Sequence, residues 1–140
     1  MNLKIQFDCA NVDWEIVAGT LKRVGMASYS PEIHQQAFAN SRVVVFVFDG
    51  DRLVGFGRAL ADGVYQGAVY DVATLPEYQG QGIGRMIVER IKRSLPQCNL
   101  ILYAAPGKEN FYAKLGFKRM KTGMALFGQA AEMARKGFTD

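Results

Sequence analysis

The sequence predicts an α/β (α+β) fold in which a mixed, mostly antiparallel sheet of six or seven strands is flanked by about four helices. Several short runs of β-branched and aromatic residues are joined by tight turns, which is typical of antiparallel strands. One predicted strand, Ala68 to Thr74, is instead followed by a glycine-rich turn, a long helix and a further strand, Leu100 to Ala104. Such a βαβ unit joins two parallel strands by a right-handed crossover. The sheet should therefore contain one parallel step.

The first 61 residues supply the antiparallel part. Leu3 to Phe7 alternates apolar and polar residues, as a half-buried strand does. A helix capped by Asn11 should place Trp14, Val17, Leu21 and Val24 on one face, and a second helix should begin after Ser30 and end by Asn40. Arg42 to Phe48 and Leu53 to Ala61 should form a hairpin around the turn at Asp49-Gly50-Asp51.

The remaining residues supply the crossover and the C-terminal elements. The long helix opens at Gly82, carries an apolar stripe and ends before Pro96. A short helix is predicted from Glu109 to Leu115, after which Phe117-Lys118 and Met124 to Phe127 should return to the sheet. We expect the tail, residues 128–140, to be mobile or to pack on a surface.

Length and composition suit a single domain covering residues 1–140, of which 49% are hydrophobic. Because the N-terminus is charged and no run approaches about 20 apolar residues, we expect a cytoplasmic protein without a membrane partner. The only two cysteines, Cys9 and Cys98, lack metal-ligand spacing, and His34 is the single histidine. Neither a disulfide framework nor a metal site is predicted.

The formal net charge of +4 favours an anionic partner. A phosphate-bearing cofactor and a nucleic acid would both satisfy this charge. The basic residues are scattered and form no dense tract, however, so no nucleic-acid partner is expected. A homodimer is compatible with the sequence.

A glycine-rich segment, Gln79 to Arg85, follows the central strand and starts the long helix. Free N–H groups and the helix dipole at such a position bind phosphate. The segment lacks the Lys and Ser/Thr of a P-loop, and the antiparallel strands before it disfavour a dinucleotide-binding unit. An anion site and a simple tight turn are therefore the two interpretations that the local residues allow.

Two motifs together resemble the GNAT superfamily of acyl-CoA N-acyltransferases. Gln79-Gly80-Gln81-Gly82-Ile83-Gly84 matches the superfamily's Gln/Arg-x-x-Gly-x-Gly/Ala signature. Phe111-Tyr112-Ala113-Lys114-Leu115-Gly116-Phe117 resembles its Phe-Tyr-x-x-x-Gly-Phe element, although Ala105 replaces an Asn that many members have seven positions before the tyrosine. The resemblance covers most of residues 42–127. It implies a sheet whose central parallel pair splays apart.

The resemblance also implies acetyl-CoA as co-substrate, with no metal. Backbone N–H groups of the glycine-rich segment should hold the CoA pyrophosphate, and main-chain groups of the preceding strand should pair with the pantetheine arm and the acetyl group. The implied cofactor-binding residues are Val72, Ala73, Thr74, Gln79, Gly80, Gln81, Gly82, Ile83, Gly84 and Arg85.

Tyr112 and Asp71 are the candidate catalytic residues. Tyr112 corresponds to the family tyrosine near the CoA sulfur, where a phenol can protonate the departing thiolate. Asp71 lies at the substrate-side end of the strand that should bind the acetyl group, where it could orient the amine, act as a base or simply cap nearby backbone. His34 has a suitable pKa for a base, but a structural role is expected for it. Cys98 has no evident base beside it, which favours direct transfer over an acyl-cysteine intermediate.

The predicted function is transfer of an acetyl group from acetyl-CoA to a primary amine. A small-molecule amine, aminosugar or arylalkylamine is favoured over a protein. The alternative is a CoA-binding regulatory module without catalysis. Four residues are candidates for the walls of the acceptor site: Tyr29, Phe38, Arg58 and Tyr65. Each of them is explained equally well as a surface or core residue.

Overall fold

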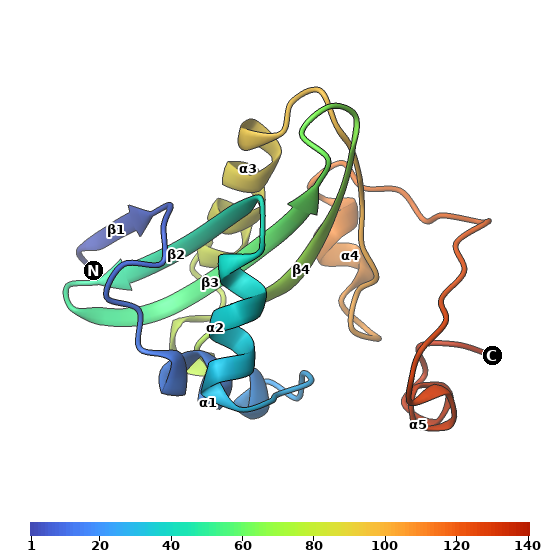
Figure 1. Cartoon of the computed structure of the whole chain (residues 1–140), viewed down its shortest axis with the longest axis horizontal. Coiled ribbons are helices and arrows are strands. Elements are labelled where there is room, and N and C mark those ends of the chain that lie inside the picture. Colours follow the sequence, from blue (N-terminus) through green and yellow to red (C-terminus); the bar gives the residue numbers. More distant parts are fainter. The chain divides into compact units, whose positions relative to one another are not determined.

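The computed structural model describes all 140 residues, which form two compact units, Met1–Leu102 and Tyr103–Asp140. The first unit contains a sheet in which neighbouring strands follow the chain order β1-β2-β3-β4-β5 (Figure 1). The strands are β1 (Leu3–Gln6), β2 (Val43–Asp49), β3 (Arg52–Ala61), β4 (Gln66–Thr74) and β5 (Asn99–Ile101). All pairs are antiparallel except β4 and β5, which confirms the predicted fold class.

Three α-helices and one 3₁₀ turn complete the first unit: α1 (Trp14–Arg23), α2 (Pro31–Ala39), η1 (Pro76–Tyr78) and α3 (Ile83–Ser94). The predicted cap of α2 is confirmed, because the Ser30 side chain accepts a hydrogen bond from the backbone N–H of Ile33. The predicted cap of α1 is wrong. Asp13, not Asn11, accepts from the N–H of Glu15, while Asn11 lies two residues earlier with a φ of 56°.

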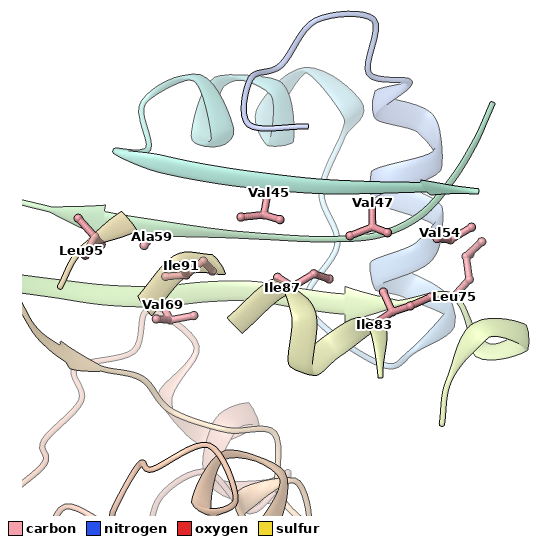
Figure 2. Packing of buried hydrophobic residues seen from close by; sticks show 10 residues of the cluster. All are labelled: Val45, Val47, Val54, Ala59, Val69, Leu75, Ile83, Ile87, Ile91 and Leu95. Carbon is pink, nitrogen blue, oxygen red and sulfur yellow. The ribbon is translucent and has the colours of Figure 1, made fainter. Parts of the chain in front are cut away.

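The helices cover the two faces of this sheet and produce two cores. α2 crosses the front of the sheet in Figure 1, and α3 lies behind it. On the α3 side, Ile83, Ile87 and Ile91 pack against strand residues such as Val45 and Val69, as Figure 2 shows. On the other side, α1 and α2 pack on the sheet through a second set of buried residues, which includes Val17, Leu21, Phe38, Phe46 and Phe56. The strands of this unit are therefore held from both sides by apolar side chains.

The second unit, residues 103–140, contains α4 (Glu109–Ala113) and α5 (Ala130–Arg135). Its aromatic side chains meet edge to face, with Tyr103 contacting both Phe127 and Phe138 at ring-centroid distances of 5.4 and 5.8 Å. The tail predicted to start at residue 128 thus includes a helix and a packed aromatic ring.

The predicted return of Phe117-Lys118 and Met124 to Phe127 to the sheet is wrong, and the sheet has five strands rather than six or seven. A strand requires a hydrogen-bonded neighbour, and neither segment has a ladder partner. Met124 and Leu126 are 96% and 101% exposed, so the apolar composition that suggested a strand does not correspond to burial here.

None of the helices combines the length and the apolar character needed to cross a bilayer. No group of three or more His, Cys, Asp or Glu side chains gathers at one place to bind a metal ion.

Candidate functional site

A β-bulge interrupts β4 at the predicted catalytic residue Asp71. In the ladder between β3 and β4, Phe56 pairs with Ala73 and Arg58 pairs with Tyr70, so Gly57 alone lies opposite Asp71 and Val72. Asp71 has a φ of 58°, a left-handed conformation that non-glycine residues rarely adopt and that Asp tolerates better than most. Such bulges bend a strand and redirect a side chain.

Beyond its first three residues, β4 separates from its parallel neighbour. Pairing between β4 and β5 covers only Gln66–Ala68, whereas β4 continues to Thr74 without a strand partner on that side. The N–H of Leu75 donates to the carbonyl of Val54 on β3. Because main-chain groups alternate along a strand, those of Val72 and Thr74 face the unpaired side. These groups are positioned to pair with an extended ligand.

The glycine-rich segment follows directly and ends at the N-terminus of α3. Gly82 occupies the N-cap position with a φ of 84°, and no side chain caps the helix there. The N–H groups of the first turn, Ile83 to Arg85, consequently have no intrahelical acceptor. A Cβ atom built on Gly80 or Gly82 would meet no atom within 4 Å, so the backbone here is accessible to a ligand. The segment can therefore bind an anion through N–H groups and the helix dipole.

The cofactor-binding residues predicted from the sequence contribute in different ways. Ile83 and Ala73 are buried in the core with exposed fractions of 1% and 5%, so only their backbone can reach a ligand. Gln79, Gly80, Gln81, Gly82 and Arg85 are exposed. The Gln79 side chain donates through Nε2 to the carbonyl of Thr74 over 3.1 Å, which links the turn to the end of β4.

A network of charged side chains braces η1, the turn that precedes the glycines. Glu77 accepts hydrogen bonds from Arg23 at the end of α1 (2.9 Å) and from Arg52 at the start of β3 (3.0 Å). Its own backbone amide and then these two guanidinium groups lower the pKa of Glu77 to about 2. Beside it, the hydroxyl of Tyr78 donates to Asp49 over 2.6 Å.

This network predicts a pH-dependent stability difference between the wild type and Glu77→Gln. The pKa of Glu77 in the folded state is about 2, below its ordinary value of 4.5, so its stabilising effect is complete above about pH 4.5 and is lost as the pH falls toward 2. Denaturant unfolding from pH 7 to pH 3 should show Glu77→Gln less stable at neutral pH, with the difference shrinking in acid.

The control for this experiment is Glu32→Gln, which changes an exposed acidic residue in the first turn of α2. Glu32 forms no ion pair, so Glu32→Gln should lower the stability at neutral pH less than Glu77→Gln does. A constant difference between wild type and Glu77→Gln across the pH range would show that the two ion pairs of Glu77 do not stabilise the fold.

Asp71 forms an ion pair with Arg58 on the face of the sheet that carries α2. Its Oδ2 accepts from Nε of Arg58 over 2.7 Å, and the side chains are 22% and 15% exposed. His34, in α2, is 3% exposed, and its Nε2 accepts the N–H of Tyr29 over 2.9 Å. Burial lowers the pKa of His34, with Arg58 adding to this effect and Asp71 opposing it. His34 is thus buried at the start of α2, with its Nε2 engaged in a hydrogen bond to the backbone before the helix.

Tyr112 lies in α4 of the second unit. Its ring contacts those of Phe111 and Phe117 edge to face, with centroid distances of 4.9 and 5.9 Å. Burial raises the pKa of the Tyr112 phenol above its ordinary value of 10. The phenol therefore stays protonated at neutral pH, as a proton donor must be.

A family model for the acetyltransferase (GNAT) domain matches residues 39–119, which is more than half of the chain. The chain belongs to the GNAT family of acetyltransferases. This GNAT chain resembles an acetyltransferase of the same family from Streptococcus pneumoniae with a TM-score of 0.76 and 28% identity. That similarity covers 91% of this chain and 98% of the other.

Curated relatives carry N-acetyltransferase names. The GNAT chain is 30% identical over 78% of its length to the uncharacterized N-acetyltransferase ycf52 of Pyropia yezoensis. It is 37% identical over 68% of its length to serotonin N-acetyltransferase 2, chloroplastic, of Oryza sativa subsp. japonica. The matched regions span 60% and 51% of these two relatives, so the chain corresponds to little more than half of each.

Within the first unit of this GNAT chain, the predicted strand end Val72–Thr74 leads through η1 directly into the glycine-rich segment at the start of α3. Sequence reasoning proposed Arg58 only as a wall of the acceptor site and missed its pairing with Asp71. The bulge in β4 brings Asp71 to Arg58. The only local sequence feature that points to this bulge is Gly57 on the opposite strand. Of the other proposed walls, Phe38 is core at 1% exposed, whereas Tyr29 and Tyr65 are 60% and 61% exposed.

Proposed function

We propose that this chain transfers the acetyl group of acetyl-CoA to a primary amine by direct attack. The observation that carries the proposal is the continuity between the unpaired edge of β4 and the free N–H groups at the start of α3. An extended chain with a phosphate at one end has the shape and the charge to bind both features. The pantetheine arm and pyrophosphate of CoA have this chemistry.

The residues present fit acetyl-CoA. The main-chain groups of Val72 and the N–H of Thr74 would pair with the amides of the pantetheine arm, as a neighbouring strand would, whereas the Thr74 carbonyl already accepts from Gln79. The N–H groups from Gln79 to Arg85 would hold the pyrophosphate, where the positive end of the α3 dipole stabilises negative charge. The side chain of Arg85 lies exposed in the same turn and adds a cation.

The reaction requires three proton movements. The ammonium form of the acceptor gives one proton to water and becomes a neutral amine; its nitrogen then forms a bond to the thioester carbonyl carbon and releases a second proton to water, while the carbon–sulfur bond breaks and the thiolate gains a proton. In this proposal Asp71 binds the acceptor on the bulge of β4, and the hydroxyl of Tyr112 protonates the thiolate and is itself reprotonated by water. The phenol of Tyr112, whose pKa is raised by burial, is protonated at neutral pH, as this role requires.

The acceptor in this proposal is a small cationic amine. The carboxylate of Asp71 is 22% exposed, which lets it meet a solute at the strand bulge. The rice relative named a serotonin N-acetyltransferase makes an arylalkylamine the first acceptor to test.

Binding of CoA tests the cofactor assignment through thermal unfolding. A ligand that binds only the folded state at 100 times its dissociation constant stabilises that state by about 2.7 kcal/mol, so the melting temperature should rise by several degrees. Gly82→Val should abolish the rise, because a side chain there would project from the backbone that binds the pyrophosphate.

The matched control is Gly50→Val in the turn between β2 and β3. Gly50 also has a positive φ, of 59°, and a Cβ added there would likewise meet no atom within 4 Å, so both variants place a side chain on left-handed backbone without a steric clash. Gly50→Val should melt at a lower temperature yet keep the increase caused by CoA. A wild-type melting temperature that millimolar CoA leaves unchanged would refute the cofactor assignment.

A further inference from the structure

The guanidinium group of Arg58 is held on several sides. Its Nε donates to Asp71, and its Nη1 donates to the hydroxyl of Ser41 over 3.3 Å. Its central carbon lies 5.7 Å from the ring centroid of Phe38 and 5.3 Å from that of Tyr70. Ser41 is itself fixed, because its hydroxyl donates to the carbonyl of Ala37 over 2.8 Å. Arg58 therefore has little freedom to move, which suits a group that positions another one.

The bulge in β4 is what allows Arg58 to meet two consecutive residues. Along a regular strand, neighbouring side chains point to opposite faces of the sheet. Tyr70 and Asp71 nevertheless both contact Arg58, and this requires the left-handed backbone at Asp71. Backbone strain of this kind persists where the surrounding structure enforces it, and it gathers at functional sites.

The ion pair occupies only one of the two carboxylate oxygens of Asp71. Oδ2 accepts from Arg58, while Oδ1 accepts no hydrogen bond from the protein. His34 is buried, and its Nε2 accepts the N–H of Tyr29, so that nitrogen does not donate to the carboxylate of Asp71. Asp71 thus presents one oriented oxygen that can accept a hydrogen bond from a cation.

We propose that Arg58 is a positioning residue for the acceptor: it holds Asp71 through Oδ2 so that Oδ1 binds the ammonium group of the amine. This inference rests on the proposed acetyl transfer. It assigns Asp71 to binding the cationic acceptor rather than to removing its proton. A fixed carboxylate makes a charge-assisted hydrogen bond in one geometry, so less freedom is lost when the amine binds.

Steady-state kinetics with three primary amines, serotonin, glucosamine 6-phosphate and spermidine, test the role of Arg58. Arg58→Gln should raise the KM for the accepted amine by roughly 10- to 100-fold, the range for a lost charged hydrogen bond, while the KM for acetyl-CoA stays unchanged. Arg58→Lys should recover part of the loss, because it keeps the charge but not the planar group. The control Arg135→Gln removes an arginine paired with Glu132 and should leave both constants unchanged.

A double-mutant cycle separates positioning from general damage to the fold. If Arg58 acts through Asp71, then Arg58→Gln combined with Asp71→Asn should raise the amine KM no further than Asp71→Asn alone. Additive increases would overturn the proposal, as would an unchanged amine KM in Arg58→Gln. Melting temperatures identify any variant that fails to fold. If Arg58→Gln is unfolded, Arg58→Lys takes its place in the cycle with Asp71→Asn.

Calorimetric titration of the same amines into CoA-saturated protein gives a readout without turnover. Arg58→Gln should weaken amine binding by a factor similar to the rise in KM. If the wild type acetylates an amine and Arg58→Gln binds that amine with the same affinity, this inference alone is refuted. A wild type that neither binds nor acetylates any of the three amines refutes the proposed function as well as the inference.

Discussion

Tyr112→Phe is expected to lower turnover by about 100-fold. The substitution keeps the ring and its contacts with Phe111 and Phe117 but deletes the hydroxyl that would protonate the thiolate. General-acid catalysis contributes on the order of 10²-fold or more, and 10²-fold corresponds to about 2.7 kcal/mol of transition-state stabilisation. The KM for acetyl-CoA should change little, because the hydroxyl acts on charge that develops in the transition state.

Steady-state kinetics of the purified variant measure this effect, with the melting temperature as a check on folding. Tyr103→Phe is the matched control, because it removes a hydroxyl from another tyrosine of the second unit, which is 53% exposed and whose ring also packs edge to face on two phenylalanines. Its turnover should equal that of the wild type. Since water can also donate the proton, a tenfold loss in Tyr112→Phe would indicate a partial role, whereas wild-type turnover would make Tyr112 a packing residue.

Gly57→Ala should destabilise the fold by about 1 to 3 kcal/mol, the usual cost of adding a methyl group to a packed core. A Cβ at this position would lie 2.7 Å from Cγ2 of Ile87 and 3.2 Å from Cγ2 of Val72. Ile87 is completely buried between α3 and the sheet, so it cannot move aside without cost. Because Gly57 lies opposite the bulge at Asp71, amine acetylation should fall as well.

Denaturant unfolding of Gly57→Ala measures the free energy of unfolding directly. Gly19→Ala supplies the opposite comparison, because Gly19 lies within α1 and a Cβ there would meet no atom within 4 Å. Alanine is the better helix former by up to about 1 kcal/mol, so Gly19→Ala should stabilise the protein. Equal or higher stability of Gly57→Ala would show that the core adapts and that glycine is not required opposite the bulge.

Much of the first unit could be predicted because local patterns and tertiary packing agree there. The apolar stripe that predicted the long helix is buried in the structure, where Ile83, Ile87 and Ile91 line one core. Ser30-Pro31 predicted the start of α2 correctly. At the start of α1, Asn11 and Asp13 are both good caps, and sequence alone does not decide between them. The choice depends on where the chain leaves β1.

The C-terminal strands were not predictable from local residues. The run from Met124 to Phe127 is apolar, and apolar runs of this length do not distinguish a strand from other structures. Pairing depends on whether another strand presents free main-chain groups, which is a property of the whole fold. The near-complete exposure of Leu126 shows that hydrophobic composition did not by itself produce a buried strand.

At the candidate site, the sequence located the backbone elements better than the side-chain contacts. Gly80 and Gly82 identified the turn before α3, and Gly84 lies in the first turn of that helix; glycines at such a position leave main-chain N–H groups accessible. The pair formed by Arg58 and Asp71 depends on a one-residue bulge, and residue types alone do not reveal the altered register.

Acetyl transfer itself is tested by detecting both products after incubation of the protein with acetyl-CoA and an amine. Mass spectrometry should find an acetylated amine for at least one of serotonin, glucosamine 6-phosphate and spermidine, together with an equal amount of free CoA thiol. Gly82→Val should form neither product. Binding of CoA without acetylation of any of these amines would contradict the proposed transfer and would instead indicate a CoA-binding regulatory module.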